Sequence, residues 1–310
     1  MNSLKGRDFL SVTDFNREEI EEVLFLAKKL KLESMTGNKL SNYLKGKTVA
    51  LFFEKPSTRT RISFEVGVYE LGGYPLYLNT QDMQLKRGET IKDTAKVLER
   101  YVSGIMARVY SHNTLIELAE FASIPVINGL SDLEHPCQIL GDFFTIREKK
   151  GDKKVKIVYL GDGGNNVAHS LILGSAILGY ELVCSCPDDY LPNPDIYNKA
   201  LNISEKTGAK ISIEKDPKIA VKMADVLYTD VWVSMGQEGE KEKRLSVFPP
   251  YQLNSNLLSL AKDDVIVMHC LPAHRGEEIT DEVMDSAYSV VFDQAENRLH
   301  VQKAIMALLI

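Results

Sequence analysis

The chain is poor in several features that would assign it to a special class of protein. Its 310 residues contain only four cysteines, and no apolar run approaches the roughly 20 residues that a membrane-spanning helix requires. The cysteines show neither CxxC spacing nor the density of a disulfide framework, so we expect free thiols in a reducing compartment. These absences argue against a membrane protein and against a disulfide-stabilised secreted protein.

An excess of basic residues is also missing. Lys and Arg number 37 against 43 Asp and Glu, which gives a net charge of -6. A general nucleic-acid-binding protein needs a basic surface, so we expect no nucleic-acid partner, and any anion site must be local. Residues 1–15 have neither the apolar core of a signal peptide nor the composition of a transit peptide, so we expect a cytoplasmic protein.

What is present is an alternation of short buried strands and amphipathic helices, which is typical of parallel sheets covered by helices. The expected strands are residues 47–53, 74–78, 104–108, 125–127, 155–161, 181–186, 210–214, 226–233 and 265–269. The expected helices are a first one capped by Thr13 or Asp14 and then 61–71, 90–101, 114–123, 167–178, 197–207 and 296–309. The sequence therefore predicts an α/β fold.

The alternation restarts after the charged segment 147–154, which predicts two doubly wound parallel-sheet domains. The final helix has no strand after it, so we expect it to cross back to the first domain. The predicted domains are residues 1–142, completed by about 295–310, and residues 143–294.

Hydroxyl and guanidinium groups are concentrated between the first strand and the next helix, at Ser57, Thr58, Arg59, Thr60 and Arg61. A helix N-terminus has unpaired N–H groups and about half a positive charge, so arginines are unfavourable there unless an anion compensates them. The alternative is that the hydroxyls only cap the helix. The cluster favours a phosphate site.

Other polar residues of the first half are less specific. Arg108 ends a strand, where ligands bind in open parallel sheets, but a surface salt bridge explains it equally well. Gln84 lies in a polar segment, 81–90, that reads as a solvated loop. His135 and Gln138 flank a proline turn and can direct donors at a carbonyl oxygen that gains charge, although a turn histidine is often structural.

In the second half, LGDGGNNVAHS at 160–170 fails the dinucleotide fingerprint, because Asn166 stands where the third glycine belongs. Asn165 and Asn166 either cap a helix or bind an amino-acid carboxylate. Asp230 lies near the end of the strand expected at 226–233 and is placed to hold an ammonium group. Cys270 is either a reactive or a plain buried thiol, and the adjacent His269 is a poor base for it because neighbouring strand residues point to opposite faces. No spacing resembles a zinc site.

Four stretches, taken in order, resemble the aspartate and ornithine carbamoyltransferase family over essentially the whole chain. They are STRT at 57–60, HPCQ at 135–138, DVWVSMG at 230–236 and HCLPAHRGEEI at 269–279. The SMG and HCLP segments resemble the ornithine branch. Cys137 departs from the threonine that family members often carry, but it lies between two expected contacts.

The resemblance implies transfer of a carbamoyl group from carbamoyl phosphate to the δ-amine of L-ornithine in arginine metabolism, with biosynthesis favoured and putrescine as an alternative amine. The implied carbamoyl phosphate contacts are Ser57, Thr58, Arg59, Thr60, Gln84, Arg108, His135, Gln138, Cys270, Leu271 and Arg298. The implied ornithine contacts are Asn166, Asp230, Ser234 and Met235. The implied catalytic residues are Arg59, Arg108, His135, Asp230 and Cys270.

The resemblance also implies that no metal or organic cofactor is required and that the protein forms homotrimers or multiples of trimers. Gln84 is the candidate for reaching across a subunit interface. A rival of a different class is a non-catalytic dinucleotide-binding or regulatory protein built on the second half, which the missing third glycine disfavours.

Overall fold

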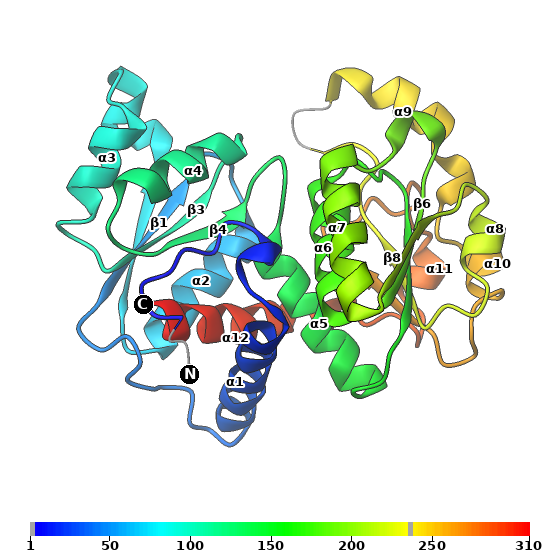
Figure 1. Ribbon diagram of the computed structural model, residues 1–310, viewed down its shortest axis with the longest axis horizontal. Coiled ribbons are helices and arrows are strands. Elements are labelled where there is room, and N and C mark those ends of the chain that lie inside the picture. Colours follow the sequence, from blue (N-terminus) through cyan, green and yellow to red (C-terminus); the bar gives the residue numbers. More distant parts are fainter. Residues whose placement is uncertain (1–3, 235–237) are drawn as a thin grey trace. The chain divides into compact units, whose positions relative to one another are not determined.

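The computed structural model describes residues 4–234 and 238–310, which form two compact units. Unit 1 comprises Met1–Phe144 and Glu296–Ile310, and unit 2 comprises Thr145–Ala295. Each unit contains one parallel sheet flanked by helices, so the predicted α/β class with two parallel sheets is confirmed (Figure 1). Among the described residues, no helix is both long and apolar enough to cross a membrane.

Unit 1 is built on a parallel sheet with the strand order β2-β1-β3-β4. Its strands are β1 (Thr48–Phe53), β2 (Tyr74–Asn79), β3 (Gly104–Arg108) and β4 (Val126–Leu130). Its helices and 3-10 turns are η1 (Val12–Asp14), α1 (Arg17–Met35), α2 (Thr58–Glu70), η2 (Thr80–Asp82), η3 (Gln84–Arg87), α3 (Ile91–Leu98), α4 (His112–Phe121), α5 (Pro136–Lys150) and α12 (Val291–Leu309). The units divide within α5 and within α12. Apolar side chains of β1 and β3 pack against α3 and α4. Arg108 at the end of β3 lies 3.4 Å from Thr60 in the first turn of α2, so the carboxyl end of this strand lies beside the start of that helix.

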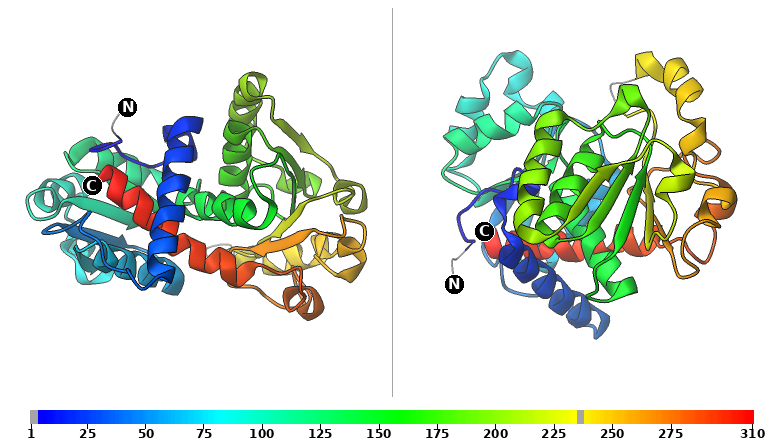
Figure 2. Two further views of the ribbon diagram at one scale, coloured as in Figure 1. Left: turned by 90° about the horizontal axis from the view of Figure 1, so that it is seen from below. Right: turned by 45° about the vertical axis from the view of Figure 1, so that its right-hand side comes forward.

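The final helix packs against unit 1, as predicted. Gly67 on α2 permits this contact, because a Cβ there would lie 3.1 Å from Met306 Cε. The buried Lys303 Nζ of α12 lies 2.6 Å from Glu70 Oε2 of α2. Helix α1 crosses α12, as the left view of Figure 2 shows. Lys31 donates from α1 to the side chain of Asn297 at 2.7 Å.

Unit 2 contains a parallel sheet with the strand order β7-β6-β5-β8-β9. Its strands are β5 (Lys156–Leu160), β6 (Glu181–Ser185), β7 (Lys210–Ile213), β8 (Val226–Thr229) and β9 (Ile266–His269). Its helices and 3-10 turns are α6 (Asn166–Leu178), η4 (Asp188–Tyr190), α7 (Pro194–Thr207), α8 (Pro217–Ala220), η5 (Glu238–Glu240), α9 (Lys241–Val247), η6 (Pro249–Tyr251), α10 (Ser255–Leu258) and α11 (Asp281–Met284). Helices α8, α10 and α11 share an apolar core with the sheet, while α6 and α7 lie together on its other side (Figure 1).

The predicted cap of the first helix is wrong. Asn16 caps α1, because its side chain accepts a hydrogen bond from Glu19 N at 2.9 Å. Thr13 and Asp14 instead belong to the preceding 3-10 turn, which Ser11 caps. Asp14 closes that turn by accepting from the backbone N–H of Ser11 at 2.8 Å, so its carboxylate is already used.

The strand predicted for residues 226–233 also ends earlier, at Thr229. The two neighbouring strands end at the same level, because Thr229 is paired with Leu160, the last residue of β5, and with His269, the last residue of β9. With both partners finished, the chain leaves the sheet at Asp230. This residue and Cys270 therefore both lie immediately beyond the carboxyl ends of adjacent strands.

Candidate active site

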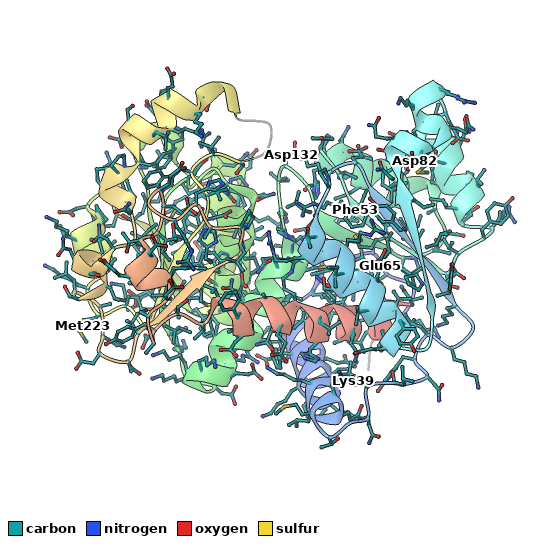
Figure 3. The ribbon with its side chains drawn as sticks, turned by 180° about the vertical axis from the view of Figure 1, so that it is seen from behind. Lys39, Phe53, Glu65, Asp82, Asp132 and Met223 are labelled. Atoms are coloured by element: carbon teal, nitrogen blue, oxygen red, sulfur yellow. The ribbon has the colours of Figure 1, made fainter. Side chains whose placement is uncertain are left out.

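In unit 1, a helix N-terminus is formed directly after a buried strand. β1 ends at Phe53, which is labelled in Figure 3, and Ser57 caps α2 by accepting from Thr60 N at 3.3 Å. The helix thus begins at Thr58, earlier than the predicted residue 61, and Arg59 and Thr60 lie in its first turn. The unpaired N–H groups of this turn and the helix dipole favour an anion here.

Two arginines from distant parts of unit 1 meet at the buried hydroxyl of Thr60. Arg298 of α12 donates from Nη2 to Thr60 Oγ1 at 2.8 Å, and Arg108 Nη1 lies 3.4 Å from the same oxygen. Arg298 is 3% exposed and Arg108 7% exposed, so both cationic groups are largely removed from water. One hydroxyl therefore fixes two guanidinium groups, and buried cations of this kind suit an anionic ligand.

His135 lies among the same cations, just before α5. It is buried, and its pKa is lowered well below the ordinary value of 6.5, first by loss of solvation and then by the charges of Arg298, Arg108 and Arg59. The imidazole is therefore neutral near neutral pH. A neutral imidazole among fixed positive charges can still donate one hydrogen bond to a carbonyl oxygen.

The first turns of α5 add a buried amide. Gln138 donates from Nε2 to Asp142 at 2.8 Å, while its Oε1 is buried without a hydrogen-bond partner among the described residues. An unsatisfied buried acceptor of this kind suits a ligand that brings an N–H donor. Cys137 points elsewhere, since its Sγ lies 3.3 Å from the Asn128 carbonyl and burial raises its pKa to about 12.

Arg59 and Arg61 differ although they are two positions apart. The Nε of Arg59 is buried without a hydrogen-bond partner among the described residues. Arg61 instead pairs with Glu65 at 3.0 Å, and its guanidinium lies 3.7 Å from the ring centroid of Tyr77. Figure 3 shows Glu65 on α2. Arg61 is therefore engaged within unit 1, whereas Arg59 retains a donor for a ligand.

Two further cases concern residues of the first half. Gln84 begins η3 and is exposed, so the structure of a single chain does not place it with the buried cations. Lys55, which was not among the predicted contacts, is 8% exposed, and its Nζ lies 4.6 Å from the Tyr110 ring centroid. Its position two residues before the cap of α2 was the available signal.

In unit 2, one asparagine joins two predicted site residues. Asn165 caps α6 by accepting from Val167 N at 2.7 Å. Its Nδ2 donates to Asp230 at 3.0 Å and to Ser234 at 3.2 Å. Asn166 begins α6 and is half-buried. The sequence left both asparagines open, and capping and site formation turn out to be combined in Asn165.

Cys270 and Asp230 are in direct contact. Cys270 donates from Sγ to Asp230 Oδ1 at 2.9 Å, and the same oxygen accepts from Val231 N at 2.8 Å. Burial raises the pKa of Asp230, against the lowering effects of His269 and these hydrogen bonds. A carboxyl group with a raised pKa beside a thiol can accept a proton more readily than an ordinary aspartate.

His269 lies beside this contact, and its two ring nitrogens are engaged with other groups. Its Nε2 lies 2.9 Å from the fully buried Glu278, and its Nδ1 accepts from Leu271 N at 2.9 Å. Although ligand atoms of Asp230, His269 and Cys270 lie within 4.8 Å of one another, both nitrogens of His269 are occupied, so the group is poorly suited to a metal. Leu271 has a φ of 58°, a left-handed conformation that side chains rarely adopt and that is concentrated at functional sites. Glu278 was missed in the sequence, where nothing marks its contact with His269.

The glycine-rich turn before α6 is explained by packing. A Cβ on Gly163 would lie 2.8 Å from the Tyr190 carbonyl oxygen, so the turn must approach η4 closely. This requirement accounts for the glycine without a nucleotide. Met235, a predicted ornithine contact, lies outside the described residues.

Comparison with known proteins agrees with this geometry. A family model described as "Aspartate/ornithine carbamoyltransferase, carbamoyl-P binding domain" matches residues 7–148, and one described as "Aspartate/ornithine carbamoyltransferase, Asp/Orn binding domain" matches residues 153–309. The chain belongs to the aspartate/ornithine carbamoyltransferase family. Of the buried cations, Arg108 lies in the part matched by the first model, and Arg298 lies in the part matched by the second, as do Asp230 and Cys270.

Individual members of this family are similar over nearly their full length. The ornithine carbamoyltransferase of Thermococcus kodakarensis is 59% identical over 99% of this chain and 97% of its own. The anabolic ornithine carbamoyltransferase of Pyrococcus furiosus is 56% identical over 99% of this chain and 97% of its own. A solved structure of ornithine carbamoyltransferase from P. furiosus, 55% identical, has a TM-score of 0.96 and covers 100% of this chain and 98% of the other.

Proposed function

We propose that this protein transfers the carbamoyl group of carbamoyl phosphate to the δ-amine of L-ornithine, giving L-citrulline and phosphate. The observation that carries the proposal is the buried cluster at the start of α2, where Arg108 and Arg298 meet at Thr60 beside a neutral His135. Unit 1 is the carbamoyl phosphate-binding domain, and unit 2 binds the amine.

The phosphate and the carbonyl have separate partners in this scheme. The phosphate lies on the first turn of α2, held by its N–H groups, the hydroxyls of Ser57, Thr58 and Thr60, and Arg59. Arg59, Arg108 and His135 also polarise the carbonyl oxygen, and Arg298 adds charge. The unsatisfied Oε1 of Gln138 accepts from the carbamoyl NH₂. The buried site strengthens each interaction, so most of the catalysis is positioning and electrostatic stabilisation.

The amine must lose a proton before it can attack. In water the δ-ammonium of ornithine resembles that of lysine, with a pKa of about 10, so it is mostly protonated at neutral pH. Asp230 attracts the ammonium and, with Cys270 at 2.9 Å, takes up the proton. Its raised pKa suits this role.

The chemical steps then balance without a cofactor. The nitrogen lone pair forms a bond to the carbonyl carbon, and the carbonyl electrons move to oxygen beside His135 and the arginines. When the C=O bond re-forms, the bond to the phosphate oxygen breaks and phosphate leaves with the electron pair. The second amine proton passes to the departing phosphate.

Several finer assignments belong to this proposal. Asn166, Ser234 and Met235 bind the α-amino-acid end of ornithine, which distinguishes it from putrescine, and Cys270 and Leu271 contact both reactants. The enzyme works in arginine biosynthesis in the cytoplasm as a homotrimer or a multiple of trimers, with Gln84 reaching a neighbouring subunit. The anabolic name of the P. furiosus relative supports the direction.

The direct test is a citrulline assay with the purified protein, carbamoyl phosphate and ornithine. We expect citrulline from ornithine, no carbamoyl aspartate from aspartate, and poor turnover of putrescine. Preferred carbamoylation of aspartate or putrescine would contradict the ornithine assignment. Sedimentation measures the trimer, and carbamoyl phosphate, rather than NAD, should raise the melting temperature.

The site itself is tested by a pair of variants in one helix turn. Arg59→Ala should abolish citrulline formation, because it removes contacts to both the phosphate and the carbonyl. Arg61→Ala removes a similar charge that is engaged by Glu65 and Tyr77, so it should retain most of the turnover. Near-normal turnover of the Arg59 variant would disprove the assignment.

A further inference from the structure

One buried arginine of unit 2 lies outside the proposed substrate contacts and has several partners. Arg244 of α9 is 5% exposed. Its Nη1 lies 2.6 Å from Asp162 Oδ2 and donates to the Trp232 carbonyl at 2.9 Å. Its Nε lies 3.0 Å from Glu240, and its guanidinium carbon lies 4.8 Å from the ring centroid of Tyr190. The planar fork of arginine allows these partners to be held simultaneously.

The partners of Arg244 adjoin the residues that form the amine site. Asp162 lies three positions before Asn165, and Trp232 lies between Asp230 and Ser234 in the chain. The side chain of Asn165 bonds to both Asp230 and Ser234. Arg244 therefore ties together the two segments whose side chains meet at Asn165.

The Asp162 side chain also shapes the turn in its own segment. While Oδ2 receives Arg244, Oδ1 accepts from Gly164 N at 2.9 Å. The side chains of Asp162 and Arg244 are 4% and 6% exposed, so removal of either one leaves a buried charge without its partner. Such a pair contributes little net stability compared with apolar packing, but it fixes geometry strongly.

We propose that Arg244 is a positioning residue for the amine substrate. By binding Asp162 and the Trp232 carbonyl, it sets the distance between the segment that carries Asn165 and the segment that carries Asp230. At this distance Asn165 holds Asp230 in place to receive the ammonium group. Arg244 does not touch the substrate in this scheme. The inference rests on the proposed carbamoyl transfer to an amine.

The kinetic consequence is selective. Arg244→Gln should lower kcat/KM for ornithine by about 10- to 100-fold, because a small misplacement of reacting groups can cost about 100-fold. KM for carbamoyl phosphate should change less than kcat/KM for ornithine, since most of its proposed contacts lie around Thr60 and involve no residue tied to Arg244. Arg244→Lys keeps the charge but not the fork and should recover part of the loss.

A matched control separates positioning from general stability. Lys262 forms a 2.8 Å ion pair with Asp225, whose side chain is 4% exposed, in the same unit. Lys262→Gln should lower the melting temperature without changing kcat/KM for ornithine. Equal kinetic losses in the Lys262 and Arg244 variants would overturn the proposal, as would an unchanged kcat/KM in a folded Arg244→Gln protein.

A double-mutant cycle and a spectroscopic signal complete the test. Asp162→Asn and Arg244→Gln should be strongly non-additive in kcat/KM, because they interrupt the same contact, and additive losses would contradict it. Trp232 is the chain's only tryptophan and is 3% exposed, so its fluorescence reports this contact without any activity. We expect a red shift in Arg244→Gln and none in Lys262→Gln. If the parent formed no citrulline, the proposed function would be wrong. An unshifted fluorescence spectrum in Arg244→Gln would separately contradict the proposed role of the contact between Arg244 and the Trp232 carbonyl.

Discussion

Substitution of Arg298 by methionine should weaken carbamoyl phosphate binding while the protein stays folded. Thr60 holds Arg298 at 2.8 Å, and in the proposed site the guanidinium also contacts the anionic ligand, where a hydrogen bond with a charged partner contributes about 1.5–3 kcal/mol. Since 1.4 kcal/mol is about tenfold in affinity, the loss corresponds to a rise of about 10- to 100-fold in KM for carbamoyl phosphate. Methionine has similar length and helix propensity, so α12 should persist. Steady-state citrulline kinetics measure the change.

The same variant has a second readout that does not depend on turnover. Among the charges that lower the pKa of His135, Arg298 is the strongest, so its removal should raise that pKa towards 6.5, which an NMR titration detects. Lys303→Met is the matched control, because it removes another buried cation of α12, paired with Glu70 at 2.6 Å. It should lower stability by about 3–5 kcal/mol without changing KM. An unchanged KM and an unchanged His135 pKa in folded Arg298→Met would refute the site.

Three further outcomes are expected. Asp230→Asn should lower kcat by at least about 100-fold without lowering the melting temperature at neutral pH. Because the pKa of Asp230 is raised, its contribution to the free energy of unfolding is present at low pH and is lost as the pH rises. A variant that is less stable than the parent only at neutral pH would contradict this. His135→Asn should reduce the loss of stability between about pH 7.5 and 5.5, because the unfolded chain takes up the His135 proton near 6.5 while the folded chain does not, and unfolding at the two pH values measures it. Gly163→Ala places a Cβ 2.8 Å from the Tyr190 carbonyl oxygen, so it should lower the free energy of unfolding by about 1–3 kcal/mol and raise KM for ornithine. In the same unfolding assay Gly164→Ala should lower it less, because its Cβ would lie 3.3 Å from a side-chain atom, Asp162 Oδ1.

Strand positions were largely readable from the sequence. The strand Gly104–Arg108 has its predicted bounds, because a continuous apolar run ends in a charge. The strand that begins at Val226 was predicted too long, because its apolar character continues to Val233 while its partners stop. The end of a strand depends on its neighbours, which the local sequence does not contain. The fold class was therefore predicted correctly, whereas the end of this strand at Thr229 could be found only from the neighbouring strands.

The candidate site was readable to a lesser degree. The cluster at residues 57–60 marks itself by chemistry, but Arg298 lies 238 residues from Thr60, and only a family resemblance selected it. Arg244 stands in the charged stretch EKEKR, where nothing in the letters distinguishes it from its exposed neighbours. Its role depends on Asp162, 82 residues away, and contacts at such separation follow from tertiary packing.

Unit 1 is made of two chain segments that are far apart in the sequence, which has a consequence for synthesis on the ribosome. Arg298 lies in the segment Glu296–Ile310, which is translated only after all of Thr145–Ala295 has emerged. A nascent chain that stalls before this segment already contains Thr60 and His135 but lacks a cation that meets them. We expect that such a truncated product neither binds carbamoyl phosphate nor is stabilised by it. Ligand binding therefore distinguishes finished polypeptides from aborted ones.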